Sequence, residues 1–203
     1  MIRFENLTKS FALKGERRVI VDGRSLTLPA GRSLQLLAGI GRPDAGRLVA
    51  DGTISWPVGF AGSFHKDLTG AQNVRFIARI YGVDTDALLA FVEDFSELGK
   101  FFHMPVRHYS SGMRSRLTFG ASMGNRFAPY MVDEVTAVGD ASFKRKSRAI
   151  FRERMAHSGA IVVNHSMSQL REYCDSGLVL EHGRVTYFED LEAAIAYHEA
   201  QMA

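Results

Sequence analysis

Residues 109–117 read Tyr-Ser-Ser-Gly-Met-Arg-Ser-Arg-Leu, and residues 130–140 read Tyr-Met-Val-Asp-Glu-Val-Thr-Ala-Val-Gly-Asp. The first run is a turn of small residues that opens a helix, and the N-terminus of a helix can bind an anion. The second run begins as an apolar strand that ends in two adjacent acids, Asp133 and Glu134. A carboxylate pair in that position can hold a metal ion and activate a water molecule. Together the two runs predict a protein that handles a nucleoside triphosphate.

A second buried strand is expected to end in a reactive side chain close to this acid pair. Residues 160–163 read Ala-Ile-Val-Val, which is typical of a parallel strand buried on both faces, and His165 follows them. Because parallel strands present their carboxyl ends at one edge of a sheet, we expect Asp133, Glu134 and His165 to lie near one another. The alternative is structural, with a solvated acid pair at a strand end and a histidine that caps a helix.

The rest of the chain predicts one α/β domain, residues 1–203, with an inserted helical subdomain. Residues 2–28 alternate apolar and polar side chains, which indicates an antiparallel β meander with Phe11 in its first loop. Another strand is expected over residues 49–60. Residues 66–125 predict an inserted helical subdomain. After it, strands alternate with helices, which indicates a mainly parallel sheet.

Composition restricts the classes of function. The 203 residues are 46% hydrophobic and 23% charged, as in ordinary soluble globular proteins. A net charge of +3 and the lack of an aromatic-plus-basic ladder argue against binding to nucleic acid. Cys174 is the only cysteine, so no intrachain disulfide is possible. No run approaches the roughly 20 apolar residues of a membrane span, so we expect a soluble chain that can dock onto a membrane protein.

The order of the motifs resembles that of the nucleotide-binding subunit of ATP-binding-cassette (ABC) transporters, a P-loop NTPase-like fold. Tyr109–Met113 is similar to the family's signature motif, Val132–Glu134 to its Walker B motif and Val138–Asp140 to its D-loop. His165 is similar to its switch histidine, and Phe11 is placed like the aromatic residue that stacks on adenine. The wording resembles the branch that exports capsular polysaccharide in four stretches, at residues 54–59, 67–73, 109–117 and 132–140.

The resemblance implies an ATP hydrolase that works as a homodimer. Two copies would meet head to tail around two molecules of ATP with Mg²⁺, and the signature motif of one copy would contact the γ-phosphate bound to the other. Closing and opening of this dimer around ATP would drive a transmembrane permease subunit, which residues 60–69 would contact at the cytoplasmic face of the inner membrane. The implied site residues are Glu134 and His165 for catalysis, Asp133 for the metal ion, and Phe11, Ser110, Ser111, Gly112 and Asp140 for the nucleotide.

One motif of the family is missing. A phosphate loop requires Gly-Lys-Ser/Thr, because the lysine reaches the phosphates and the hydroxyl binds magnesium, yet no lysine stands between Lys14 and Lys66. The flanking residues resemble the family on both sides, but Leu34 meets Gln35 directly, so roughly a dozen residues are absent. Losing this preorganised charge should lower the rate of phosphoryl transfer by orders of magnitude.

Three explanations of this gap are open. The protein is a degraded or non-hydrolysing member of the family, the gap between Leu34 and Gln35 is not natural, or Arg32 or Arg42 supplies part of a substitute phosphate site. In addition, Phe60 stands where typical members carry a magnesium-sensing glutamine. The alternative function is therefore a non-hydrolysing partner subunit that contributes only its signature motif to an intact copy.

Overall fold

A computed structural model divides the chain into two compact units. Unit 1 comprises Met1–Ile54, Ala128–Glu134 and Met155–Ala203, and unit 2 comprises Ser55–Phe127 and Val135–Arg154. The structure describes residues 2–13, 16–28, 44–59, 62, 64–133, 140–164, 166–181 and 183–202.

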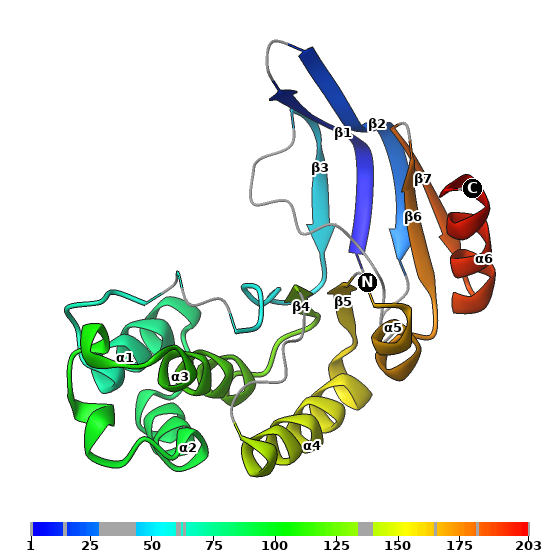
Figure 1. The fold of residues 1–203 in the computed structure, drawn as a ribbon. Coiled ribbons are helices and arrows are strands. Elements are labelled where there is room, and N and C mark those ends of the chain that lie inside the picture. Colours follow the sequence, from blue (N-terminus) through cyan, green and yellow to red (C-terminus); the bar gives the residue numbers. More distant parts are fainter. Residues whose placement is uncertain are drawn as a thin grey trace. The chain divides into compact units, whose positions relative to one another are not determined.

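Unit 1 contains an antiparallel sheet with the strand order β2-β1-β3 (Figure 1). Its strands are β1 (Ile2–Leu13), β2 (Glu16–Leu28) and β3 (Ala45–Ala50). The expected meander is therefore present, but Phe11 lies within β1 and not in a loop, because β1 stays paired with β2 as far as Leu13.

The prediction of a strand over residues 49–60 is wrong about where the strand ends. β3 ends at Ala50, and Gly52 takes a φ of +94°, a left-handed conformation that interrupts an extended chain. Trp56 consequently lies outside the strand, in the segment that enters unit 2.

The parallel pair of unit 1 is formed by β4 (Tyr130–Asp133) and β5 (Ala160–Val163). Val132 stands opposite Val162, and both side chains are buried, as their continuous apolar runs predicted. Asp133 is paired with Val163 at the last position of the ladder. The carboxyl ends of both strands thus meet at one edge, which is the arrangement that the sequence required.

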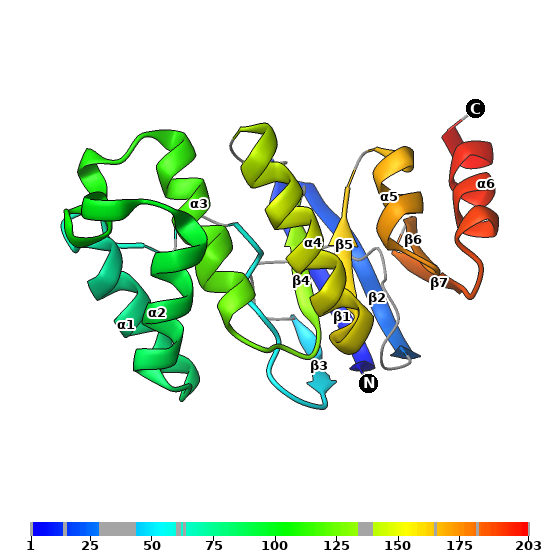
Figure 2. The same ribbon diagram turned by 90° about the horizontal axis from the view of Figure 1, so that it is seen from below.

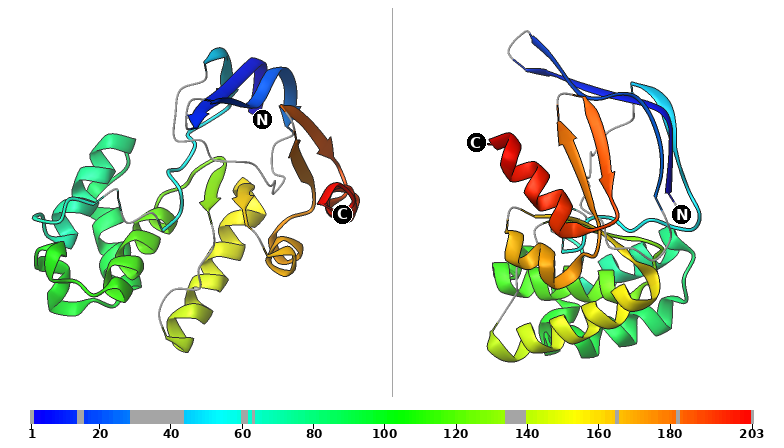
Figure 3. Two further views of the ribbon diagram at one scale, coloured as in Figure 1. Left: turned by 45° about the horizontal axis from the view of Figure 1, so that its top comes forward. Right: turned by 90° about the vertical axis from the view of Figure 1, so that its right-hand side faces the viewer.

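The end of the chain completes unit 1. α5 (Met167–Tyr173) leads to a hairpin of β6 (Gly177–Glu181) and β7 (Arg184–Phe188), and α6 (Leu191–Met202) lies beside this hairpin (Figures 2 and 3). The hairpin is joined to β2 by a hydrogen bond of 3.1 Å from the amide of Asp22 to the carbonyl of Gly183. An apolar core links the antiparallel sheet, β5 and β6 through Ile2, Phe4, Leu28, Ile161 and Leu178.

Unit 2 is helical. Its helices are α1 (Gly70–Tyr81), α2 (Thr85–Ser96), α3 (Ser111–Gly124) and most of α4 (Ala141–Ser158), with short 3₁₀ turns at η2 (Gly99–His103) and η3 (Val106–His108). α1 begins at a capping box in which Thr69 Oγ1 accepts from the amide of Gln72 at 3.0 Å and Gln72 Oε1 accepts from the amide of Thr69 at 2.9 Å. It ends at Gly82, which is left-handed.

Close helix packing builds the core of unit 2. Gly120 and Gly124 lie one turn apart on α3 and face α2, and a Cβ at Gly124 would come within 2.5 Å of Leu88 Cδ1. Trp56 packs against Tyr81 and Phe127 with ring centroids 5.0 and 5.2 Å apart. Val74, Val92, Phe102 and Leu117 are at most 1% exposed in this core.

Candidate functional site

The predicted anion-binding turn lies at the N-terminus of α3. Ser110 caps the helix, and its Oγ accepts a hydrogen bond of 3.2 Å from the amide of Met113. Ser110 and Ser111 are exposed, and the first turn of α3 contains no acidic residue. The first amide groups of a helix have no partner within it, and this turn has no carboxylate of its own, so its start suits an anion.

A buried tyrosine fixes the turn from inside the protein. The hydroxyl of Tyr109 donates to the carbonyl of Phe101 at 2.6 Å, and Arg114 donates to the carbonyl of Tyr109 at 2.8 Å. Burial raises the pKa of Tyr109 to about 12, although a hydrogen bond with the Gly70 backbone works in the opposite direction. The hydroxyl consequently stays protonated and remains a donor across the whole physiological range of pH.

The described residues leave the surface next to Gly112 open. Among them, a Cβ built on Gly112 would meet only Ser110 Oγ, at 3.9 Å. None of the residues that the structure describes therefore requires glycine at this position for steric reasons. An approaching ligand would find space beside the backbone of residues 110–112.

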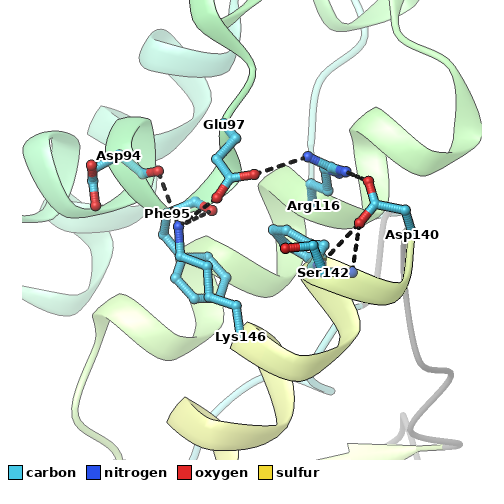
Figure 4. Close-up of polar contacts among 8 residues, drawn as sticks. Asp94, Phe95, Glu97, Arg116, Asp140, Ser142 and Lys146 are labelled. Carbon is cyan, nitrogen blue, oxygen red and sulfur yellow. Dashed lines mark hydrogen bonds and ion pairs between the residues drawn. The ribbon is translucent and has the colours of Figure 1, made fainter.

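Asp140 begins α4, and both of its carboxylate oxygens are bound within unit 2 (Figure 4). Oδ1 accepts from the amides of Ser142 and Phe143 at 3.0 and 2.9 Å, and Oδ2 lies 2.7 Å from a guanidinium nitrogen of Arg116. The hydrogen bond from the amide of Phe143 contributes most to lowering the pKa of Asp140, and the positive charge of Arg116 lowers this pKa further. Asp140 thus holds α4 and α3 together.

Phe11 is 44% exposed on β1, and the ammonium of Lys9 lies 5.1 Å from the centroid of its ring. Lys9 also pairs with Asp44 at 3.2 Å, and Asp44 accepts from the amide and the hydroxyl of Ser10 at 2.7 and 2.6 Å. These contacts, led by the Ser10 hydroxyl, lower the pKa of Asp44 to about 2. Phe11 therefore lies on a strand that is held by Asp44, and its exposed ring is accessible to a planar group such as adenine.

The remaining predicted site residues are Asp133, Glu134 and His165, and of these the structure describes only the backbone of Asp133. The backbone of Asp133 ends β4. Next to His165, Asn164 is buried, donates to Gln169 at 2.6 Å and accepts from the amide of Ser166 at 2.8 Å. The structure does not describe the other residues for which the sequence makes predictions, which are Glu134, His165, Arg32, Arg42, Phe60 and the junction of Leu34 with Gln35.

Sequence reasoning missed Asn73, which is buried in α1. Its Oδ1 accepts from the amide of His65 at 2.8 Å, and its Nδ2 donates to the carbonyls of His65, Leu68 and Thr69 at 3.1, 3.3 and 2.9 Å. The available signal was a polar side chain one turn before Ile77, on the apolar face of the helix. Asn73 holds residues 65–69 against α1.

Within the described ranges, no cluster of three or more His, Cys, Asp or Glu side chains could hold a metal ion. Among the same residues, no helix is both long and apolar enough to cross a membrane.

Relatives of known name decide the family. The chain is 43% identical to the polysialic acid transport ATP-binding protein KpsT of Escherichia coli, over 96% of this chain and 95% of the relative. It is 41% identical to the capsule polysaccharide export ATP-binding protein CtrD of Neisseria meningitidis serogroup B, over 94% and 88% of the two chains. The chain belongs to the capsule polysaccharide export branch of the ABC proteins. No family model matches it.

Solved structures agree with the fold of this ABC protein. A dimeric ATP-binding cassette in a post-hydrolysis state, bound to ADP and Pi, has a TM-score of 0.71 at 15% identity, over 92% of this chain and 98% of the other. An ATP-binding subunit of an ABC transporter has a TM-score of 0.73 at 15% identity, over 100% and 95%. The expected α/β ABC ATPase fold is thereby confirmed.

The relatives also bear on the missing phosphate loop. A second KpsT from Escherichia coli, 42% identical, aligns over 219 positions that cover 100% of both chains. Because this ABC protein has 203 residues, about 16 of the 219 positions have no counterpart in it. A loss of this size agrees with the absence of a phosphate loop of roughly eight residues and its flanks.

Proposed function

We propose that this ABC protein is the ATP-binding, ATP-hydrolysing subunit of a transporter that exports capsular polysaccharide across the inner membrane. The observation that carries the proposal is the exposed, acid-free N-terminus of α3 at Ser110–Gly112, in a chain 43% identical to KpsT. Residues 1–203 would form a single nucleotide-binding domain, with residues 66–125 as its helical subdomain. The partner would be a transmembrane permease subunit, contacted by residues 60–69 at the cytoplasmic face.

In the proposed homodimer, one copy offers its signature turn to a triphosphate held by the other. The described turn fits that task, because Ser110 and Ser111 are exposed and the space beside Gly112 is open. Bound Mg²⁺ would neutralise charge on the phosphates. Phe11 is proposed to stack on adenine, and Asp140 is proposed to contact the nucleotide. Asp133 is proposed to bind the metal ion, and Glu134 and His165 are proposed to act in catalysis.

The half-site for the chain's own triphosphate does not fit in the same way. The lysine and the adjacent hydroxyl of a phosphate loop are absent from residues 15–65. This observation favours a second candidate function, a non-hydrolysing partner subunit that lends Ser110–Gly112 to an intact copy. The two candidates differ in one respect, which is whether the chain alone turns over ATP.

The first experiment is a titration of the purified chain with ATP and Mg²⁺, followed by an assay of phosphate release. We expect hydrolysis that disappears in Glu134→Gln, because this carboxylate would polarise the attacking water. If the chain does not bind ATP at millimolar concentration, the hydrolase proposal is wrong. The partner-only function is then tested by mixing the chain with an intact relative.

The matched variant for both assays is Gly112→Asp. The open space at Gly112 lets the fold persist, whereas the new carboxylate repels the γ-phosphate. Hydrolysis, by the chain alone or by the mixture, should fall by roughly a hundredfold, since like charges brought together cost several kcal/mol. An unchanged rate in a folded Gly112→Asp protein would show that this turn does not act on the nucleotide.

A further inference from the structure

Four charged side chains form one ionic cluster, made of Glu97, Arg116, Asp140 and Lys146 (Figure 4). Arg116 of α3 lies between two carboxylates, 2.7 Å from Asp140 Oδ2 and 3.5 Å from Glu97 Oε2. Lys146 of α4 lies 2.9 Å from Glu97 Oε1. Glu97 therefore presents one oxygen to each of two cations that belong to different helices.

Aromatic rings and free carbonyl groups extend this cluster. Lys146 donates to the carbonyls of Asp94 and Phe95 at 3.4 and 3.2 Å, in the last turn of α2, where carbonyl groups lack partners within the helix. Its ammonium lies 4.9 Å from the ring of Phe95, and the guanidinium of Arg116 lies 4.5 Å from the ring of Phe143. The end of α2, the first turns of α3 and the start of α4 are thus joined at one place.

The backbone of Glu97 is unusual for its residue type. Glu97 ends α2 in the left-handed conformation, with a φ of 54°, where glycine is the common residue. α1 ends in the same conformation at Gly82, without strain. Backbone in a sparsely populated conformation persists where the surrounding contacts hold it, and here the Glu97 side chain bridges Arg116 and Lys146.

We propose that Glu97 is a positioning residue that keeps the signature turn in fixed register with the start of α4. Arg116 shares α3 with Ser110, and Asp140 caps α4, so the Glu97 carboxylate completes a connection between the two helix N-termini. Without the Glu97 carboxylate, Arg116 of α3 and Lys146 of α4 lose the negative charge that lies between them. The inference rests on the proposed function, because it concerns how accurately one copy presents its turn to the nucleotide of another.

The test measures the distance between the two helix N-termini by pulsed electron paramagnetic resonance. Spin labels are placed on Ser111→Cys and Lys144→Cys, both exposed positions, in a Cys174→Ala background. We expect a narrow distance distribution in this parent and a broader one in Glu97→Gly and in Glu97→Lys. Glu97→Gly also relieves the left-handed strain, so its unfolding midpoint should not fall below that of the parent.

Glu93→Gln is the matched control, because Glu93 lies on the same helix and pairs with His103 at 3.0 Å, away from the cluster. Its distance distribution should equal that of the parent. If either Glu97 variant also equals the parent, the inference is wrong. The distance measurement needs no nucleotide, so a wild-type chain that fails to bind ATP would contradict the proposed function alone.

A kinetic measurement then separates positioning from mere stability. In whichever assembly hydrolyses ATP, Glu97→Gly should lower kcat and leave KM for ATP unchanged, because the nucleotide is held by the other copy. The loss of kcat can reach roughly a hundredfold, since small misplacements of this kind are costly in catalysis. A changed KM with an unchanged kcat would overturn the assignment.

Discussion

At the scale of single residues, the hydroxyl of Tyr109 holds the residue that precedes the signature turn. Its acceptor, the carbonyl of Phe101, also accepts from the amide of Met104 at 2.8 Å. Removing the hydroxyl therefore leaves that carbonyl with a partner but takes one contact from the Gly70 backbone, so the cost should lie near the net value of one or two hydrogen bonds.

We expect Tyr109→Phe to lower the free energy of unfolding by about 1 kcal/mol near neutral pH, as measured with urea. Burial raises the pKa of Tyr109 to about 12 in the folded protein, above the ordinary tyrosine value of about 10. Stability from this group is thus complete below pH 10 and is lost as the pH rises toward 12. The variant should lose less stability over that interval than the wild type, and an identical pH dependence would contradict the assignment.

At the scale of elements, two sets of hydrogen bonds of different strength stabilise the start of α1. The capping box of Thr69 and Gln72 satisfies two amides at the surface. Asn73, whose side chain is buried, makes four hydrogen bonds to residues 65–69. The Asn73 contacts should matter more, since their loss removes four hydrogen bonds at once and takes from the amide of His65 its side-chain acceptor.

Asn73→Ala should therefore lower the free energy of unfolding by about 2–4 kcal/mol. Thr69→Ala, which removes only the surface box at the same helix end, should cost about 1 kcal/mol. Urea unfolding of the two variants beside the wild type makes the comparison. Equal losses would mean that residues 65–69 are not held by Asn73.

Local signals explain which elements the sequence predicted. The capping box and Gly82 bounded α1, and the apolar run at residues 160–163 identified β5 as a buried parallel strand. Prediction was poorer where one residue decides, since Gly52 ends the extended segment that was expected to reach residue 60.

The candidate site divides in the same manner. The turn at Ser110–Gly112 was identified from consecutive residues, and the structure places it at a helix N-terminus, as expected. The partners of Asp140 and Glu97 were not predicted, because Arg116 is 24 positions from Asp140 and Lys146 is 49 positions from Glu97. Ion pairs across such separations depend on how helices pack, and no periodic pattern in one segment records them.

At the scale of the whole molecule, the chain combines a formed signature turn with about 16 missing positions relative to a KpsT. Inserting the corresponding segment of that relative between Leu34 and Gln35 should raise the rate of ATP hydrolysis by roughly a hundredfold or more, because preorganised donors return to the phosphates. The control is the same insertion with its lysine replaced by alanine. Equal rates with and without the insertion would show that the chain has a substitute phosphate site.

The packing of Trp56 against Tyr81 and Phe127 has a practical consequence for the two units. Trp56 is the only tryptophan, and it belongs to unit 2. Its fluorescence emission therefore follows the melting of unit 2 alone, whereas far-ultraviolet circular dichroism follows secondary structure in both units. Coincident denaturation curves would mean that the units unfold together, and separate curves would give each unit its own midpoint. The protein thus carries a built-in optical label on the unit that presents the signature turn.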